Sequence, residues 1–328
     1  MRFLDTDIPQ LGLGTWPLGG PFYAGEQSLG YANADPGEAI KAIDAAWDGG
    51  IRLFDTANAY GAGHAEYLLG RALENRPDAI IATKVGMSFD ERTKQIGGDV
   101  TDPAQIVASI EDCLRRLRRD RIDMLFLHHN DLPVERAEPI FEIFAKARAA
   151  GKVRAFGWST DFPARVEAMA GRDGFAAVQH VMNVFFDAPS MQATLEKNGL
   201  VGFIRSPLAM GVLTGKYLAD SSVPADDIRS MNSETRDYFR DGKPGAGYLA
   251  DLDAVRELLT SGGRTLAQGS LCWLMTKSSG NLPIPGGRTA AQVEENIGAL
   301  DHGRFSQDVM EEIEAVLKRE PEGEPRSR

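Results

Sequence analysis

Short apolar runs and amphipathic runs alternate along this chain of 328 residues, and this alternation constrains its fold more than any other feature. The apolar runs have the length of a buried strand, as at residues 51–54, 79–83 and 122–127. The amphipathic runs carry helix signals, such as Asp35-Pro36 at the start of one and Gly49-Gly50 at its end. Buried strands alternating with helices indicate a parallel sheet covered by helices.

Eight such strand–helix units follow one another. The expected strands are residues 11–16, 51–54, 79–83, 122–127, 153–158, 176–181, 201–205 and 281–284. Helices are expected at residues 36–49, 64–74, 101–118, 133–150, 163–170, 189–197, 249–260, 265–276, 290–300 and 307–318. Eight units in a chain of this length fit a single (β/α)8 TIM barrel over residues 1–328, with a long irregular loop at about 206–247 and a polar tail at about 319–328.

An open doubly wound sheet is the competing α/β architecture. Such a sheet places a Gly-x-Gly-x-x-Gly turn between its first strand and first helix. Gly12 and Gly14 give Gly-x-Gly, but no glycine stands three residues after Gly14 and no helix follows. The sequence therefore favours the barrel.

Polar residues follow three successive strands. Asp55 and Tyr60 come after the second strand, Lys84 after the third and His128 after the fourth. A tyrosine titrates near pH ~10, so as a proton donor at neutral pH it needs a nearby cation and a dry wall. Lys84 can supply that cation. Any one of these elements alone is more often a loop with satisfied hydrogen bonds, but the carboxyl ends of barrel strands share one rim, so their joint arrival indicates one site.

Composition excludes several other classes of function. The net charge of −11 and the pI of about 5.1 argue against binding to nucleic acid or to an anionic membrane. Two cysteines are too few for a disulfide framework or a zinc cage, so no metal is expected. With no signal-peptide pattern at the start and no apolar run long enough to span a membrane, we expect a cytoplasmic protein.

Three segments together resemble signatures of the aldo-keto reductase superfamily. They are Asp55-Thr56-Ala57-Asn58-Ala59-Tyr60-Gly61, Thr83-Lys84-Val85-Gly86 and Ile122-Asp123 with His128. The resemblance extends over about residues 11–317 and implies hydride transfer between a nicotinamide cofactor and a carbonyl compound. It makes Tyr60 the general acid, Lys84 the cation that lowers its pKa, Asp55 the acid paired with Lys84, and His128 the residue that orients the carbonyl.

The resemblance also assigns a cofactor side. Ser159 and Gln179 match positions that bind the nicotinamide carboxamide, Thr160 stands where the family commonly has asparagine, and Arg288 is placed for a 2′-phosphate. Arg205 is expected to stack on the nicotinamide, reach the diphosphate, or form a salt bridge at the barrel rim. NADPH is the expected cofactor, with NADH as the alternative. The expected cofactor-binding residues are Thr15, Trp16, Ser159, Thr160, Gln179, Arg205, Ser206, Pro207, Leu208, Gly211, Leu213, Lys216, Gly286, Arg288, Gln292, Glu295 and Asn296.

The expected function is reduction of an aldehyde or ketone, sugar-derived ones included, to the alcohol. Trp16, Phe89 and His129 are candidates for the substrate pocket, although His129 is favoured as a rim residue or one bonded to backbone. One alternative is a sugar dehydrogenase that uses NAD+. Another is a cofactor-sensing regulatory subunit with vestigial activity. The expected partner is a small carbonyl compound, for a chain that is a monomer or part of a small homo-oligomer.

Overall fold

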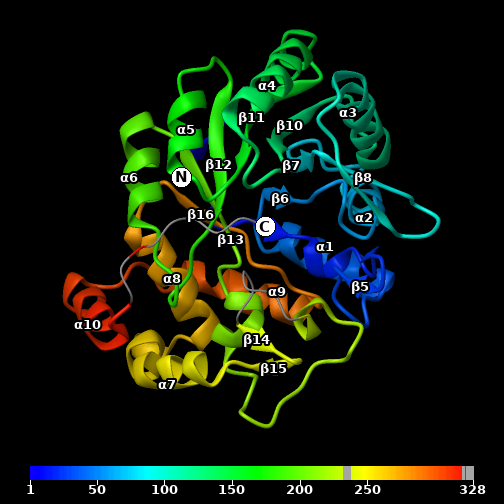
Figure 1. Cartoon of the computed structure of the whole chain (residues 1–328). Coiled ribbons are helices and arrows are strands. Elements are labelled where there is room, and N and C mark those ends of the chain that lie inside the picture. Colours follow the sequence, from blue (N-terminus) through cyan, green and yellow to red (C-terminus); the bar gives the residue numbers. More distant parts are fainter. Residues whose placement is uncertain (232–237, 320–321, 323–328) are drawn as a thin grey trace.

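Eight parallel strands form one sheet in the computed structural model of this protein, which describes residues 1–231, 238–319 and 322. If the small hairpins are left aside, each strand of this sheet lies beside the strand that comes next along the chain, and loops and helices connect the two (Figure 1). In spatial order the strands are β3 (Leu13–Gly14), β6 (Leu53–Asp55), β7 (Ile80–Val85), β10 (Ile122–Leu127), β11 (Val153–Ser159), β12 (Phe175–Val181), β13 (Val201–Arg205) and β16 (Asn281–Pro283).

The first and last strands of this sheet meet, and the barrel closes there. Gly12 donates from its backbone N to the carbonyl of Pro283 at 2.9 Å, and Gly14 donates to Pro285 at 3.0 Å. A Cβ at Gly14 would lie 2.6 Å from the carbonyl oxygen of Ile284, so only glycine permits this approach. The predicted (β/α)8 barrel is therefore confirmed.

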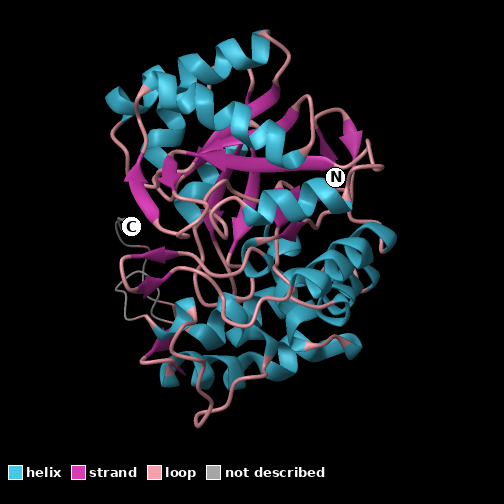
Figure 2. Ribbon diagram, turned by 90° about the vertical axis from the view of Figure 1, so that its right-hand side faces the viewer, coloured by secondary structure: helices cyan, strands magenta, loops and turns pink. Residues whose placement is uncertain are grey.

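Helices surround the strands, as the views in Figures 1 and 2 show. The expected N-cap of the first helix is present, since the Asp35 side chain accepts from Glu38 N at 2.8 Å. Within the described ranges none of the helices is both long and apolar enough to cross a membrane. The helices are α1 (Pro36–Asp48), α2 (His64–Ala72), α3 (Pro103–Leu117), α4 (Val134–Ala149), α5 (Pro163–Met169), α6 (Pro189–Asn198), α7 (Ala246–Thr260), α8 (Leu266–Lys277), α9 (Ala290–Ile297) and α10 (Gln307–Leu317).

Two apolar cores hold the barrel together. One lies between the strands and the helices, and the other fills the barrel interior. Inside, the ring of Phe203 contacts Phe126 and Phe3, with centroids 5.1 and 5.4 Å away. Phe3 belongs to a hairpin of β1 (Arg2–Phe3) and β2 (Thr6–Asp7), whose turn residue Leu4 accepts a hydrogen bond from Arg154 near the start of β11. The hairpin therefore covers the amino end of the barrel and leaves the carboxyl end for chemistry.

Four hairpins add to the expected elements. Besides β1–β2 they are β4 (Tyr23–Ala24) with β5 (Gln27–Ser28), β8 (Met87–Phe89) with β9 (Ile96–Asp99), and β14 (Phe239–Arg240) with β15 (Lys243–Pro244). The expected irregular loop at 206–247 is thus only partly irregular, because it also contains the 3-10 helices Ala209–Thr214 and Ile228–Ser230. Residues 232–237 of that loop, and 320–321 and 323–328 of the expected tail, lie outside the described residues.

Candidate active site

Lys84 is the centre of a buried hydrogen-bond network at the carboxyl end of the barrel. Its ammonium donates to Asp55 Oδ2 at 2.8 Å, to the Thr56 carbonyl at 2.6 Å and to Tyr60 Oη at 3.2 Å. These three bonds use all three ammonium protons. The side chain of Lys84 is fully buried and that of Asp55 is nearly so. The structure thus brings together the three residues at adjacent ends of β6 and β7.

Burial and charge act in opposite directions on these groups. Burial lowers the pKa of Lys84, but Asp55 and Tyr60 raise it by more, so the net pKa is raised and Lys84 stays charged. Burial raises the pKa of Tyr60 above its ordinary value, and the nearby charge of Lys84 offsets only part of that rise. The pKa of Tyr60 is therefore raised overall, whereas the charge of Lys84 alone would lower it. Tyr60 is therefore a phenol at neutral pH, and it has a proton to donate.

The ring of Tyr60 is fixed on several sides. Trp16 stacks on it with centroids 5.9 Å apart and planes 17° apart, and His128 meets it edge-on at 6.1 Å. The next residue, Gly61, has φ +60°, and a Cβ there would lie 1.8 Å from the carbonyl oxygen of Gly19. The glycine after Tyr60 therefore lets the loop that carries Trp16 pack against the tyrosine.

His128 lies at the end of β10 as a neutral imidazole. Burial lowers its pKa well below the ordinary value, and the positive charge of Lys84 lowers it further. Within the part of the chain that the structure describes, its buried Nδ1 has no hydrogen-bond partner. A neutral imidazole beside a phenol can hydrogen-bond a carbonyl oxygen without carrying charge.

The neighbouring candidates His129 and Phe89 differ in their positions. His129 lines the cavity, but its Nε2 is 3.3 Å from the Val100 carbonyl and its Nδ1 is 3.5 Å from the Asp99 carboxylate. This matches the favoured interpretation as a rim residue bonded to backbone. Phe89 lies outside the cavity wall, beneath the guanidinium of Arg116 at 5.3 Å. Phe89 is therefore not among the residues that line this cavity, because the β8–β9 hairpin carries it away.

Ser159, Gln179 and Arg205 line the cavity from the ends of β11, β12 and β13. Gln179 Nε2 donates to Asp55 Oδ1 at 2.8 Å, which connects this side of the barrel to the lysine network. Arg205 forms a salt bridge with Asp161, whose other oxygen accepts from Val181 N at 2.9 Å. Of the three interpretations of Arg205, the structure shows the salt bridge at the rim. Asp161 was missed, although its position just after a strand is a signal that could have identified it.

Thr160 is buried behind the wall. Its hydroxyl donates to the carbonyl of Asn130 at 2.6 Å and accepts from Phe162 N at 3.3 Å, so it faces the loop and not the cavity. Asn130 itself lines the cavity, and its side-chain oxygen accepts from Asp161 N at 2.9 Å. The structure therefore does not bring Thr160 into the site, and it places Asn130 there instead.

Three cations gather at the other end of the cavity. They are Lys216, Arg229 and Arg288, and all three line it. Burial and, after it, the positive charges of Arg229 and Arg288 together lower the pKa of Lys216 to about 8. The side chain of Lys216 is exposed, and the described residues offer its ammonium no ion pair. A cavity lined by three cations fits the phosphates of a dinucleotide.

A backbone segment ties two of these cations together. Ala32 donates from its N to Asp227 Oδ2 at 3.0 Å, and its carbonyl accepts from Arg288 Nη1 at 3.0 Å. Asp227 in turn binds Arg229 through both oxygens, at 2.6 and 2.7 Å. The loop after the first strand and the loop after β13 thus close over the end that carries the cations. Asp227 and Arg229 belong to the long loop after β13, whose conformation no spacing in the sequence predicts.

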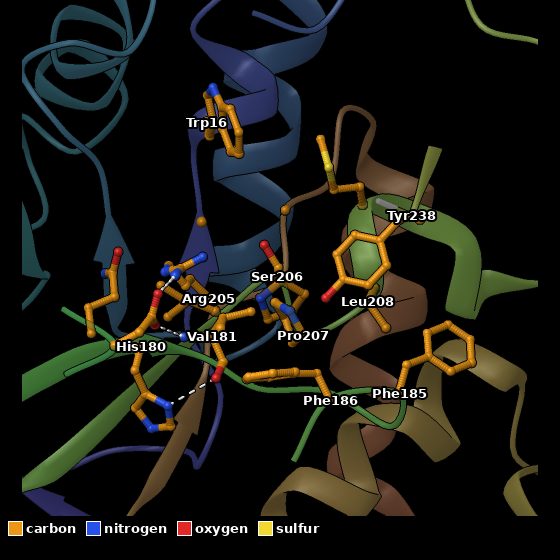
Figure 3. A pocket seen from close by; sticks show the side chains of 18 of the residues that line it. Trp16, His180, Val181, Phe185, Phe186, Arg205, Ser206, Pro207, Leu208 and Tyr238 are labelled. Atoms are coloured by element: carbon orange, nitrogen blue, oxygen red, sulfur yellow. Dashed lines mark hydrogen bonds and ion pairs between the residues drawn. The ribbon is translucent and has the colours of Figure 1, made fainter. Parts of the chain in front are cut away.

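Eighteen of the expected residues line a single cavity of about 1370 Å³ at the carboxyl end of the barrel. Figure 3 shows part of this cavity, where Trp16, Arg205 and Ser206 are among the labelled residues. Besides Phe89 and Thr160, three expected residues do not line it: Lys84 lies behind Asp55 and Tyr60, while Thr15 and Leu213 are buried in the wall. The residues that line it are Trp16, Asp55, Tyr60, His128, His129, Ser159, Gln179, Arg205, Ser206, Pro207, Leu208, Gly211, Lys216, Gly286, Arg288, Gln292, Glu295 and Asn296.

Comparison with known proteins agrees with this geometry. The model of the Aldo/keto reductase family matches residues 10–318. The aldo-keto reductase YhdN of Bacillus subtilis is 28% identical over 88% of this chain and 85% of its own, and the L-glyceraldehyde 3-phosphate reductase of Escherichia coli K12 is 29% identical over 94% and 88%. The solved glycerol dehydrogenase of Gluconobacter oxydans superposes with a TM-score of 0.80 at 28% identity, covering 98% of this chain and 95% of that one. An aldo-keto reductase of Klebsiella pneumoniae, solved with NADPH, shares the fold at a TM-score of 0.68 and 23% identity, over 99% and 96%.

Proposed function

Because this chain belongs to the aldo/keto reductase family, we propose that it reduces an aldehyde or a ketone to the alcohol with NADPH. One observation carries the proposal: the Lys84 ammonium bonds both Asp55, at 2.8 Å, and the hydroxyl of Tyr60, at 3.2 Å. A charged, buried lysine on a tyrosine hydroxyl prepares that hydroxyl to give up its proton. An ion pair that served stability alone would not need a tyrosine hydroxyl beside it that lines a cavity.

In the proposed reaction Tyr60 and His128 bind the carbonyl oxygen. When bound, the nicotinamide of NADPH supplies the hydride to the carbonyl carbon. As negative charge develops on the oxygen, the Tyr60 hydroxyl transfers its proton to it and His128 stabilises it by a hydrogen bond. Lys84 stabilises the tyrosinate that remains. Asp55 keeps Lys84 charged throughout.

The remaining lining residues suit the cofactor. Ser159 and the carbonyl end of Gln179 are available for the carboxamide, at the ends of β11 and β12. Lys216, Arg229 and Arg288 would bind the phosphates. Gln292, Glu295 and Asn296 lie on α9 for the adenine, where Gln292 already accepts a hydrogen bond from Arg288 N at 2.9 Å. Two strongly cationic neighbours of Lys216 favour NADPH, with its additional phosphate, over NADH.

A dehydrogenase of a sugar or polyol is the second candidate. The likeness to a glycerol dehydrogenase, at a TM-score of 0.80, supports it. Oxidation of an alcohol would use the same residues, with Tyr60 returning as the base. The cofactor ratio in the cell would then select the direction.

The test measures cofactor binding first and turnover second. Titration with NADPH and with NADH is followed by tryptophan fluorescence, since Trp16 lines the cavity. Trp16→Phe identifies the signal, and Trp47→Phe, on the outer helix α1, is the matched control. NADPH consumption is then measured with an aldehyde panel and NADP+ reduction with a polyol panel. Tight NADPH binding with aldehyde turnover supports the proposal. Absence of binding would refute it, and turnover of polyols alone would favour the second candidate.

A further inference from the structure

The cavity is larger than one ligand site, and its far part has aromatic walls. Its volume of about 1370 Å³ exceeds the roughly 300–1,000 Å³ typical of a pocket for a drug-sized ligand. Its lining includes Phe185, Phe186, Leu208, Tyr238 and Tyr248, a group that we call the aromatic compartment. Charged residues of α7 and α10, among them Asp251 and Glu314, also line the cavity. Leu208 is also among the expected cofactor-binding residues, whereas the reaction described above gives the four aromatic side chains no role.

The turn that carries Phe186 is fixed to the catalytic rim. Asn183 and Phe186 exchange two backbone hydrogen bonds of 2.9 Å, and Asn183 Nδ2 donates to the Ser206 carbonyl at 3.0 Å. Val181, just before this turn, pairs in register with Arg205. Figure 3 shows Phe186 lying beside Ser206 and Pro207, on the same rim as Arg205. The compartment therefore opens directly from the part of the cavity that is expected to bind cofactor and substrate.

The opposite wall is built in advance of any ligand. Tyr238 Oη accepts from Asn183 Nδ2 at 2.7 Å, and the rings of Tyr238 and Tyr248 lie 5.2 Å apart. Tyr248 also contacts Phe185 at 5.1 Å. Phe186, in contrast, has 44% of its surface exposed, which is unusual for so large an apolar side chain inside a concavity. A preformed aromatic wall facing an uncovered phenyl ring suits a flat apolar group between them.

We propose that the aromatic compartment binds a ring-bearing, apolar part of the carbonyl substrate while its carbonyl group lies at Tyr60 and His128. The inference rests on the proposed function and specifies its substrate class. It separates this chain from a small triose or polyol enzyme, because a three-carbon substrate would leave Phe186 uncovered. Aromatic substrates gain from edge-to-face and offset contacts with phenylalanine and tyrosine beyond the area they bury.

The test compares two aldehydes on matched variants. The ratio of kcat/KM for 2-naphthaldehyde to that for propanal is measured for the wild type, Phe186→Ala, Phe186→Tyr and Tyr67→Ala. Tyr67 is an aromatic residue of similar exposure, 47%, on α2 outside the cavity. We expect the ratio to fall by about fivefold to tenfold in Phe186→Ala, and to stay at the wild-type value in Phe186→Tyr and Tyr67→Ala. An unchanged ratio in Phe186→Ala overturns the proposal.

A second measurement separates this inference from the proposed function. Calorimetry measures binding of 2-naphthalenemethanol to the protein saturated with NADP+. If no aldehyde is turned over, the proposed function fails, and this binding alone decides on the compartment. Binding that weakens in Phe186→Ala and not in Tyr67→Ala supports the aromatic compartment. Absence of binding, or equal weakening in both variants, overturns it.

Discussion

Gln179 donates a 2.8 Å hydrogen bond from its Nε2 to Oδ1 of Asp55, and this bond joins the two functional halves of the barrel mouth. Asp55 belongs to the lysine network of β6 and β7, whereas Gln179 belongs to the β12 side expected to contact the cofactor. Since Lys84 occupies the other carboxylate oxygen at 2.8 Å, both oxygens of Asp55 have a partner. The orientation of Gln179 and the charge of Lys84 thus depend on one buried carboxylate.

Replacing Gln179 by leucine should affect both halves. The substitution leaves a buried carboxylate oxygen without a donor, which costs about 1–3 kcal/mol. We expect the free energy of unfolding to fall by this amount and NADPH to bind more weakly, as measured by urea denaturation and fluorescence titration. Gln105→Leu, at an exposed position of α3, is the control. Loss of stability with unaltered NADPH affinity would show that Gln179 does not serve the cofactor.

Replacing Tyr60 by phenylalanine should separate chemistry from binding. The general acid is removed while the ring between Trp16 and His128 remains, so turnover should fall by about 10²–10⁴-fold. Because the hydroxyl is not expected to contact the phosphates, NADPH affinity should be unchanged. Steady-state kinetics and a binding titration check both parts, with Tyr67→Phe as the control. Turnover close to wild type would eliminate Tyr60 as the proton donor.

Replacing Lys84 by methionine should leave Asp55 as a buried, uncompensated carboxylate. Breaking a buried ion pair on one side costs about 3–5 kcal/mol. We expect a loss of this size from urea denaturation, together with loss of turnover. The double variant Asp55→Asn/Lys84→Met removes both charges, so it should recover part of the stability but none of the activity. If the double variant is no more stable than Lys84→Met, the uncompensated charge of Asp55 is not the cause of the lost stability.

The sequence predicts the barrel and its catalytic rim because both follow from local patterns. Eight apolar runs are visible without tertiary information, and Asp55, Lys84 and His128 each stand at the end of one. Their meeting then follows from strand parallelism alone. The positions of Ser159 and Gln179 are predictable for the same reason, since they share a register in β11 and β12.

The loops resist this reasoning, because their conformation depends on contacts between distant segments. Phe89 follows a predicted strand closely, yet a hairpin that pairs Met87 with Asp99 carries it out of the site. Ala32 and Asp227 are 195 residues apart and meet through one hydrogen bond. The direction of the Tyr60 pKa also escapes the sequence, because it depends on how completely the phenol is buried relative to its distance from Lys84.

Replacing Arg288 by alanine should discriminate between the two cofactors. If Arg288 binds the 2′-phosphate, a lost charge-assisted bond lowers NADPH affinity by about 10–100-fold and leaves NADH affinity nearly as it was. Fluorescence titration with both cofactors measures the difference. Arg304→Ala, an exposed arginine outside the cavity, should change neither. Equal losses for NADPH and NADH would place the 2′-phosphate elsewhere.

Lys216 should make NADPH binding depend on pH in a defined direction. Burial and the charges of Arg229 and Arg288 lower its pKa to about 8, so its ammonium loses a proton as the pH rises through that value. A bound phosphate favours the charged form, so NADPH affinity should fall as the pH rises from about 7 to about 9, and binding near pH ~8 should take up protons. Calorimetry in buffers of different ionisation enthalpy measures that uptake.

Lys216→Arg keeps the charge throughout this range, because arginine titrates above pH ~12, and it should abolish the uptake while preserving affinity. Proton uptake that persists in Lys216→Arg would assign it to another group, whereas its absence from the wild type would show that Lys216 does not contact the phosphates.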